Sequence, residues 1–448
     1  MPRNLWGFGP MTGDVTDMHQ PVRAGIAAFV GTMIEWYDFF IYGTAAALVF
    51  GRLFFPQVDS FYGTLAAFGT FAVGFLARPL GGAIFGHLGD RVGRKKSLII
   101  TLVMMGVSTI LIGLLPTHAM VGIWAPILLV TLRFVQGIAV GGEWGGAVLL
   151  AGEHARTEDR RTFMASFAQL GSPAGLILSM VMFKFVTLLP EAELLSWGWR
   201  VPFLFSAVML VVGFAIRMGV KESPDFIAAQ RQRLASLKQD QAPLREIFAT
   251  SKGLLIAAIC SNVLGISGFY FTNTFMISYT TSYLGLARGT IIDCLLIVSI
   301  MQFVITPLSA YIAERTSVIR FLVCTAAYSI VAPYAMFMLV EQRDLVSVTL
   351  GIGIAVAGLG AYYAVIAGYV SASFPTRYRY TGISMAYQLS GAIFGGLTPL
   401  LGTMLAQNAN GNWMPLAILF SLISTISLVS VLALHALRNR TDALPQAA

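Results

Sequence analysis

The stretch Gly86-His87-Leu88-Gly89-Asp90-Arg91-Val92-Gly93-Arg94-Lys95-Lys96 places one acidic and four basic side chains between two long apolar segments. The segments cover residues 61–85 and 97–116, and each can cross a bilayer as a helix, which takes about 20 residues. A short charged turn between two spanning helices must lie at a membrane face. Because Arg and Lys are in excess in this turn, the sequence predicts that the face is cytoplasmic.

The composition of the whole chain is that of a membrane protein. Of its 448 residues, 56% are hydrophobic and only 11% are charged, whereas a soluble domain carries about 25% charged residues. The mean hydropathy is +0.75. The net charge of +8 comes from bases beside apolar segments rather than on one polar face, so it does not indicate a nucleic-acid partner. The first twenty residues lack the pattern of a removable signal peptide.

Working outward from the charged turn, we expect twelve membrane-spanning helices. Six cover residues 23–50, 61–85, 97–116, 121–151, 163–187 and 199–219, and six cover residues 253–284, 289–313, 318–340, 345–373, 379–407 and 413–437. A long polar stretch separates the two sets. We therefore expect an N-terminal six-helix bundle in residues 1–220, a cytoplasmic and partly amphipathic linker in residues 221–252, and a C-terminal six-helix bundle in residues 253–448.

The Lys and Arg residues are spread unevenly over this arrangement. With both termini inside, 22 of the 29 fall on cytoplasmic segments and four on outer segments. Arg78, Arg133 and Lys184 lie within predicted helices. This bias predicts a multi-pass protein of the bacterial inner membrane with both termini in the cytoplasm.

The two sets of six helices also resemble each other. Phe167-Ala168-Gln169-Leu170 aligns with Ala386-Tyr387-Gln388-Leu389, and Glu314-Arg315 follows its helix as Asp90-Arg91 follows the earlier one. The alternative is chance similarity between apolar helices. Two repeats of six helices are typical of transporters that hold their substrate at the midplane between the repeats.

Ionisable residues inside the predicted helices are the first candidates for function, because a charge at that depth costs several kcal/mol. They are concentrated in the first half. Asp38 and Arg133 are the expected pair, since an arginine favours the charged carboxylate and burial favours the neutral acid. Glu35 lies three residues before Asp38 and can share its helix face. We expect proton coupling by Asp38, Glu35, Arg133 and Glu143; a static structural ion pair is the alternative.

The substrate is expected to meet arginine in the first half and neutral polar groups in the second. Arg78 can offer a planar, bidentate ligand to a carboxylate, although a position near the helix end would let it snorkel instead. Ordinary interhelical hydrogen bonding is the alternative for the neutral residues. The predicted substrate-binding residues are Arg78, Arg133, Tyr42, Gln169, Tyr270, Asn273, Gln302, Tyr362, Tyr387 and Gln388.

The charged turn suggests a gate. Asp90 can approach the positive N-terminal end of the helix at 379–407, and Arg94 can hold Asp90 in place. We expect the gate to consist of Asp90, Arg91, Arg94 and Arg379. The second copy, Glu314–Arg320, lacks the glycine and the inner arginine, so we expect a second latch to be weak or absent.

The turn closely resembles the signature loop between helices 2 and 3 of the major facilitator superfamily, and Leu132–Gly137 resembles a second signature on helix 4. Four further segments resemble the metabolite:proton symporter family, with shikimate-type transporters nearest: Glu35–Gly43, Phe75–Gly82, Gly141–Ala147 and Ser196–Phe203. The C-terminal half matches more loosely, best at Arg377–Gly382.

This resemblance implies an all-α fold of two pseudo-symmetric six-helix bundles and alternating access. Members of the family import shikimate, citrate, α-ketoglutarate, or proline and betaine together with protons. We expect import of a small organic acid, with a di- or tricarboxylate or a zwitterionic osmolyte as alternatives and a drug exporter as a weaker one. The osmosensing members carry a long C-terminal coiled coil, which the end of this sequence does not resemble.

An enzyme is not expected. The five histidines, His19, His87, His118, His154 and His435, are dispersed and form no nucleophile–base set. The three cysteines lie in apolar segments and predict buried thiols. We therefore expect no cofactor and no metal, and a monomer whose partners are an organic acid, protons and the lipid bilayer.

Overall fold

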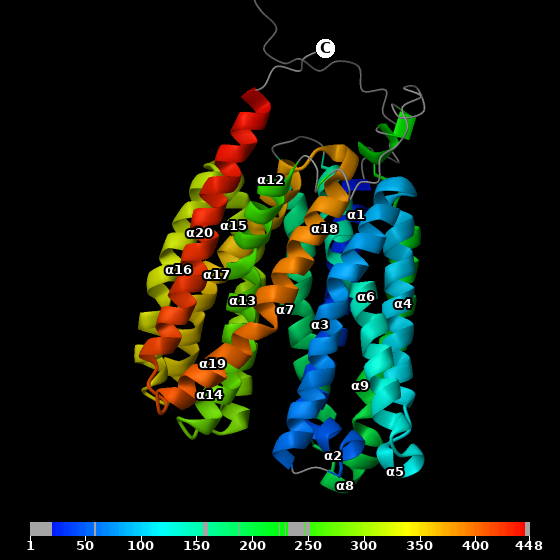
Figure 1. Cartoon of the computed structure of the whole chain (residues 1–448), viewed down its shortest axis with the longest axis vertical. Coiled ribbons are helices and arrows are strands. Elements are labelled where there is room, and N and C mark those ends of the chain that lie inside the picture. Colours follow the sequence, from blue (N-terminus) through cyan, green and yellow to red (C-terminus); the bar gives the residue numbers. More distant parts are fainter. Residues whose placement is uncertain are drawn as a thin grey trace, which may run out of the picture.

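The computed structural model describes residues 20–57, 60–155, 160–186, 188–223, 225–228, 230–231, 247 and 251–443. Every regular element in these ranges is a helix. The helices form two bundles that stand side by side, with α7 and α18 between them (Figure 1). Most of the predicted linker at 221–252 lies outside the described residues.

The N-terminal bundle comes from the first half of the chain. Its elements are α1 (Gln20–Ala45), η2 (Ala46–Phe50), α2 (Gly51–Phe54), α3 (Ser60–Arg91), α4 (Arg94–Leu114), α5 (His118–Val121), α6 (Trp124–Glu153), α7 (Arg161–Val186), α8 (Glu191–Glu193), η4 (Leu194–Gly198) and α9 (Arg200–Met218).

The C-terminal bundle repeats this arrangement. Its elements are α12 (Lys252–Ser261), α13 (Val263–Tyr270), η5 (Phe271–Phe275), α14 (Met276–Ser282), α15 (Arg288–Arg315), α16 (Val318–Val340), α17 (Leu345–Ser373), η6 (Thr376–Tyr378), α18 (Arg379–Ser390), η7 (Gly391–Gly395), α19 (Leu397–Asn408) and α20 (Met414–Ala443).

The twelve expected spans are confirmed. Among the described residues, 11 helical runs are long and apolar enough to cross a membrane. The twelfth is the broken run α18–η7–α19. Three spans contain π-helical turns that the sequence pattern did not predict, namely η2, η5 and η7. Such turns loosen the helical hydrogen bonding and are frequent at functional sites.

The charged turn is shorter than expected. Helix α3 continues to Arg91 and α4 begins at Arg94, so only Val92 and Gly93 separate them. Gly93 has φ +125°, a conformation that residues with a side chain rarely adopt, and this one glycine reverses the chain. The charges that were predicted for a loop therefore lie on two helix ends.

We call the end of the molecule where α3 meets α4 the latch end; it is uppermost in Figure 1. The opposite end, with α2, α5, α8 and α14, is the far end. The two bundles touch through reciprocal helices: α7 packs on α15 and α17, and α18 packs on α3 and α6. The repeat thus brings the starts of α7 and α18 against the ends of α15 and α3.

Candidate functional site

Two arginines occupy the centre of the N-terminal bundle. The Arg133 guanidinium on α6 lies over the rings of Tyr42, Phe71 and Phe39, with its Cζ 4.2, 5.0 and 5.1 Å from their centroids. Arg78 on α3 lies 4.4 Å from the centroid of Phe75 and 4.7 Å from that of Phe39. Aromatic faces attract these cations and fix the guanidinium planes. Both arginines are buried.

Glu35, on α1, lies near Arg78. Its side chain is buried, and its Oε2 has no hydrogen-bond partner. Its charge acts on Arg78 and on three tyrosines of the C-terminal bundle, Tyr270, Tyr363 and Tyr387. The structure therefore brings the predicted residues Glu35, Arg78, Tyr270 and Tyr387 into one neighbourhood at the junction of the bundles.

Asp38 is not paired directly with Arg133, which corrects the expected ion pair. Its carboxylate accepts hydrogen bonds from Thr109 Oγ1 at 2.7 Å and Ser206 Oγ at 2.6 Å. Arg133 donates to Gln136 at 2.5 Å, and Gln136 donates to Thr109 at 2.8 Å. Asp38 points toward α4 and α9 while Arg133 points toward α1 and α3, so two neutral side chains connect them.

Glu143 forms a direct buried ion pair with Arg217 on α9. Thr101 Oγ1 donates to the same carboxylate at 2.5 Å. Arg217 is 2% exposed although it stands one residue before the end of its helix. The sequence reading counted Arg217 among the bases that flank the membrane, because its position along the helix does not show that its long side chain turns inward.

A polar cluster joins the two bundles at mid-depth. Trp144 on α6 stacks on Tyr387 on α18, with ring centroids 3.6 Å apart. The Trp144 indole N–H donates to Gln169 Oε1 at 2.7 Å, and Gln169 Nε2 donates to the carbonyl of Tyr363 at 2.8 Å. The Tyr363 and Tyr387 hydroxyls lie 2.9 Å apart. Trp144 was not among the predicted site residues.

Several buried polar atoms at this junction have no hydrogen-bond partner. Besides Glu35 Oε2 they include Arg133 Nε, Gln388 Oε1, Ser172 Oγ, Ser384 Oγ and Ser390 Oγ. Gln388 uses its amide nitrogen, which lies 3.4 Å from the carbonyl of Val140 across the bundle interface. Because buried polar atoms in proteins almost always find partners, such a group points to a polar ligand or solvent.

Three predicted substrate-binding residues make contacts within the C-terminal bundle. Tyr362 donates to the carbonyl of Ser261 at 2.7 Å, inside the C-terminal bundle. Neighbouring residues on a helix face different directions, so Tyr363 reaches the interface and Tyr362 does not. Asn273, in η5, donates to the carbonyl of Phe269 in α13 at 3.1 Å. Gln302 packs against Gly360 on α17.

At the latch end, Asp90 closes the contact between the bundles. Its Oδ2 accepts hydrogen bonds from the backbone N–H of Thr381 at 3.0 Å and the Thr381 hydroxyl at 2.8 Å. Thr381 is in the first turn of α18, where free N–H groups and the helix dipole attract a carboxylate. Arg94 Nη1 lies 3.3 Å from Asp90 Oδ1 and donates to the carbonyl of Gly89 at 3.0 Å.

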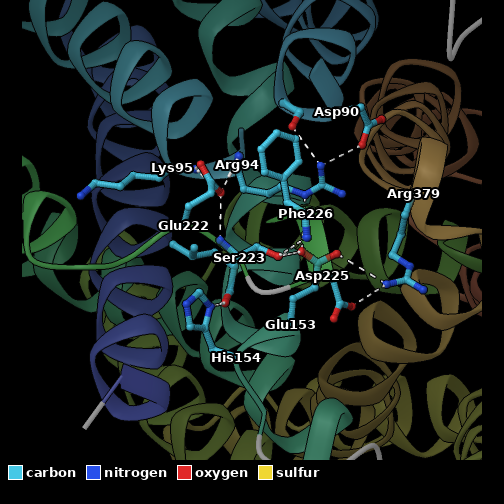
Figure 2. A network of polar contacts seen from close by, with 12 residues as sticks. Asp90, Arg94, Lys95, Glu153, His154, Glu222, Ser223, Asp225, Phe226 and Arg379 are labelled. Carbon is cyan, nitrogen blue, oxygen red and sulfur yellow. Dashed lines mark hydrogen bonds and ion pairs between the residues drawn. The ribbon is translucent and has the colours of Figure 1, made fainter. Parts of the chain in front are cut away.

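Figure 2 shows that Arg94 and Arg379 belong to one network with acids that the sequence reading did not single out. Glu153 at the end of α6 lies 3.4 Å from Arg94 Nε and 3.5 Å from Arg379 Nη1. Arg379 also contacts Asp225 at 3.2 Å. Arg91, the remaining predicted gating residue, is exposed.

The first residues of the linker complete this network. The Glu222 carboxylate accepts from the backbone N–H groups of Arg94 and Lys95, at 2.9 and 3.2 Å, and so caps α4. Ser223 donates to Glu153. The Phe226 ring lies under the Arg94 guanidinium, 5.1 Å from its Cζ. A single sequence does not reveal these contacts because they join residues about 70 to 130 positions apart.

A second latch contact is present at Glu314, so the second latch is not absent; that it is weak stays a prediction. The backbone N–H of Phe163, in the first turn of α7, donates to Glu314 Oε1 at 2.6 Å. This contact mirrors the one between Thr381 and Asp90. The missing glycine and arginine do not prevent it, because the contact needs only a carboxylate at the end of one helix and a free N–H at the start of another.

Tyr380 fills the space between the bundles next to the first latch. Its side chain is fully buried, and its hydroxyl donates to the carbonyl of Gly142 at 2.6 Å. A Cβ at Gly146 would lie 2.8 Å from Tyr380 Cζ, and one at Gly89 would lie 3.1 Å from it. Two glycines of the N-terminal bundle therefore accommodate a ring of the C-terminal bundle.

Comparisons with known proteins agree with this architecture. Residues 24–248 match the family model "Sugar (and other) transporter". The chain is 39% identical over 398 residues to the shikimate transporter of Escherichia coli K12, covering 88% of this chain and 90% of that protein. It is 32% identical over 444 residues to the proline/betaine transporter of Salmonella typhimurium LT2, covering 96% and 87%.

A solved structure shows the same fold. The major facilitator superfamily proton:xylose symporter XylE, bound to 6-bromo-6-deoxy-D-glucose, superposes with a TM-score of 0.73 at 15% identity, covering 94% of this chain and 96% of that one. The chain is therefore a multi-pass membrane transporter of the major facilitator superfamily, and it belongs to the sugar (and other) transporter family.

Proposed function

We propose that the protein is a proton-coupled symporter that imports a small organic acid, of the shikimate type, by alternating access. One observation carries the proposal. Arg78 and Arg133 lie buried at the bundle junction, and neither forms an ion pair with another described residue. A buried charge is costly in a membrane unless it is paired. A substrate carboxylate would supply the missing negative charge.

The surroundings of the arginines support a carboxylate of modest size. A guanidinium binds a carboxylate through two parallel N–H donors, and the rings beneath Arg78 and Arg133 hold their planes in place. The C-terminal bundle adds neutral hydroxyl and amide groups from Tyr270, Tyr363 and Gln388. These groups suit the hydroxyls of a small hydroxylated acid.

Glu35 and Asp38 are the proposed proton carriers, with Arg133 and Glu143 as the groups that tune them. A buried carboxyl group can be charged when positive charge or donors are near and neutral when they withdraw. Asp38 has two hydroxyl donors and an indirect link to Arg133, so a small movement of α4 or α9 changes how well its charge is stabilised. Substrate binding to the arginines would change the same balance.

We infer that the latch end faces the cytoplasm of a bacterial inner membrane, because the predicted inner segments carry the excess of Lys and Arg. The bundles, residues 1–220 and 253–448, would then rock about the central site while the linker at 221–252 joins them. In the conformation described above, in which both latch contacts are formed, the latches would close the cytoplasmic side. We propose that a monomer performs the transport.

A zwitterionic osmolyte is the second candidate. Trp36, Phe39, Phe40, Phe269 and Tyr270 form a continuous aromatic group at the bundle junction. Aromatic faces bind quaternary ammonium groups, and a proline/betaine transporter is among the relatives. Two arginines favour a net anion over a zwitterion, and citrate or α-ketoglutarate would use both arginines at once.

Uptake into proteoliposomes tests the proposal. Labelled shikimate, citrate, α-ketoglutarate and glycine betaine are supplied with and without an inward proton gradient, and a parallel set contains a protonophore. We expect accumulation of one of the acids that requires the gradient. Accumulation of betaine alone would replace the acid by the osmolyte, and accumulation unaffected by the protonophore would refute proton coupling.

A further inference from the structure

The buried ion pair of Arg217 and Glu143 lies inside the N-terminal bundle. Arg217 projects from the last turn of α9, and Glu143 comes from the middle of α6. The guanidinium also donates to the carbonyl of Leu98 at 2.5 Å, and Thr101 supports the carboxylate at 2.5 Å. The pair thus joins α4, α6 and α9.

The same guanidinium reaches a fourth helix at Gly31 of α1. A Cβ built at Gly31 would lie 2.9 Å from Arg217 Cζ and 3.2 Å from its Nε. A side chain at this position would displace the guanidinium, so the glycine makes the approach possible. Glu35 is four residues further along α1, about 6 Å or roughly one turn away. Arg217 therefore lies between two acids, Glu143 and Glu35.

The hydrogen bonds in this region are unequally distributed. Glu143 has three donors to its two carboxylate oxygens, whereas Glu35 Oε2 has none. On Arg217, both terminal nitrogens are used, while the buried Nε has no partner. Leaving buried polar atoms unpaired costs about 1–3 kcal/mol each. Glu35 Oε2 and Arg217 Nε are thus each available for a new hydrogen bond.

We propose that Arg217 is a positioning residue for proton coupling, shared between Glu143 and Glu35. The inference rests on the proposed function. When Glu35 is a neutral acid, Arg217 is bound to Glu143 alone. When Glu35 releases its proton to water on the open side, its carboxylate draws the guanidinium toward α1 and weakens the pair with Glu143. When Glu35 takes up a proton again, the pair re-forms.

Other charged or titratable groups act on Glu35 and on Arg217. Glu35 is influenced by Arg78 on α3 and by Tyr270, Tyr363 and Tyr387 of the C-terminal bundle. Tyr380 on α18 acts on Arg217 from the latch side. Arg78 competes with Arg217 for Glu35, so a substrate carboxylate that occupies Arg78 leaves Arg217 as the remaining cation. Substrate binding and proton release would be linked through this competition.

The double variant Glu143→Gln/Arg217→Gln tests the proposal. It removes both charges together and leaves two amides that can hydrogen bond, so it does not leave a buried carboxylate unpaired. The matched control is Arg52→Gln/Glu191→Gln, which removes an exposed ion pair of the same bundle. All variants are compared in proteoliposomes for substrate exchange without a gradient and for accumulation driven by one pH unit.

We expect the double variant to retain exchange within about two-fold and to lose most of the accumulation, which one proton per substrate would make about 10-fold at this gradient. The pH profile of its exchange should shift relative to the control. Adding Glu35→Gln should then change neither readout further. Arg217→Lys, which keeps the charge, should restore part of the accumulation and serves as the second folded variant.

A double variant with the accumulation and pH profile of the control would show that the pair is only structural, and would overturn the inference. Failure of the inference is distinguishable from failure of the proposed function. In the first case the parent protein accumulates substrate and the double variant accumulates it equally well. If the parent itself shows no gradient-driven accumulation, both are wrong.

Discussion

The two bundles share a fold but differ in how they use charge. The N-terminal bundle buries Glu35, Asp38, Arg78, Arg133, Glu143 and Arg217 along α1, α3, α6 and α9. In the C-terminal bundle, α13, α14 and α17 contain no Asp, Glu, Lys or Arg, and contribute tyrosines instead. A duplicated scaffold therefore carries buried charges on one side and neutral polar side chains on the other.

Under the proposed function, this difference would separate two tasks of a symporter. Groups that change charge must lie near enough to act on one another, because the interaction energy of two charges falls as the distance between them grows. Neutral hydrogen-bonding groups can be exchanged to suit another substrate without changing the proton balance. We therefore expect substitutions in the N-terminal bundle to affect coupling and those in the C-terminal bundle to affect affinity.

The largest effect is expected from Asp38→Asn. The asparagine retains contacts with Thr109 and Ser206 but cannot change its charge. Accumulation driven by one pH unit, worth about 1.4 kcal/mol or 10-fold per proton, should fall to no accumulation, while exchange persists. Asp293→Asn, at an acid of the C-terminal bundle that is more than half exposed, is the control and should accumulate normally. Accumulation by Asp38→Asn would move the coupling role to Glu35 or Glu143.

Arg78→Lys is expected to weaken substrate binding next. Lysine keeps the positive charge but loses the planar pair of donors and the flat contact with Phe75 and Phe39. A charged hydrogen bond contributes about 1.5–3 kcal/mol, so KM should rise roughly 10-fold or more. Initial uptake rates over a range of substrate concentrations measure this. An unchanged KM would assign Arg78 a packing role.

The sequence predicted the spans well and the site only in part, and the physical reason differs between residues. Hydropathy and Lys/Arg placement are summed over about 20 residues, so they located α16 and α17 at their observed bounds, Val318–Val340 and Leu345–Ser373. The direction in which one side chain points is not averaged over a span, so hydropathy and Lys/Arg placement do not predict it. For Arg217, the position at a helix end suggested the membrane surface, yet the side chain turns inward to Glu143.

Contacts between distant segments were the hardest to predict. The pair Asp90–Thr381 could be proposed because a signature loop and a helix start are both visible in the sequence. The contact between Glu314 and Phe163 uses a backbone N–H, for which any residue type serves, so the degenerate motif did not show whether a second contact forms. Glu222 and Ser223 were assigned to a linker, where no pattern indicated that they cap α4 and bind Glu153.

The two latches offer a second comparison of the bundles, because in each latch a carboxylate at a helix end of one bundle meets the start of a helix of the other. Asp90→Ala removes two hydrogen bonds from Thr381 and the contact with Arg94, whereas Glu314→Ala removes the bond from Phe163. At up to about 2 kcal/mol for a buried charge at a helix terminus, Asp90→Ala should shift the balance of the two states by up to roughly 30-fold toward opening at the latch end.

Glu314→Ala should shift the same balance in the same direction, and the loss of the hydrogen bond from Phe163, at about 1 kcal/mol, contributes about five-fold to the shift. Labelling of single cysteines placed at the latch end and the far end measures both variants. Equal shifts would show that the mirrored latches contribute equally despite the missing arginine. No shift in either variant would mean that Tyr380 and the Glu153 network keep this end closed without the helix-end contacts.

The smallest effect concerns two adjacent tyrosines of the neutral bundle. Tyr363→Phe removes the hydroxyl that meets Tyr387 at the bundle junction, and Tyr362→Phe removes the hydroxyl that donates to Ser261 inside the C-terminal bundle. A buried hydrogen bond contributes about 1 kcal/mol, which is about a five-fold change in an equilibrium constant. Tyr363→Phe should therefore change KM by up to this factor with accumulation per proton unaltered, while Tyr362→Phe should lower thermal stability and leave KM unchanged. Because the two residues are neighbours in sequence with the same chemistry, the pair isolates the direction of the side chain as the cause. A loss of proton-driven accumulation in Tyr363→Phe would show that the C-terminal bundle takes part in coupling, and the division between the two bundles would then be wrong.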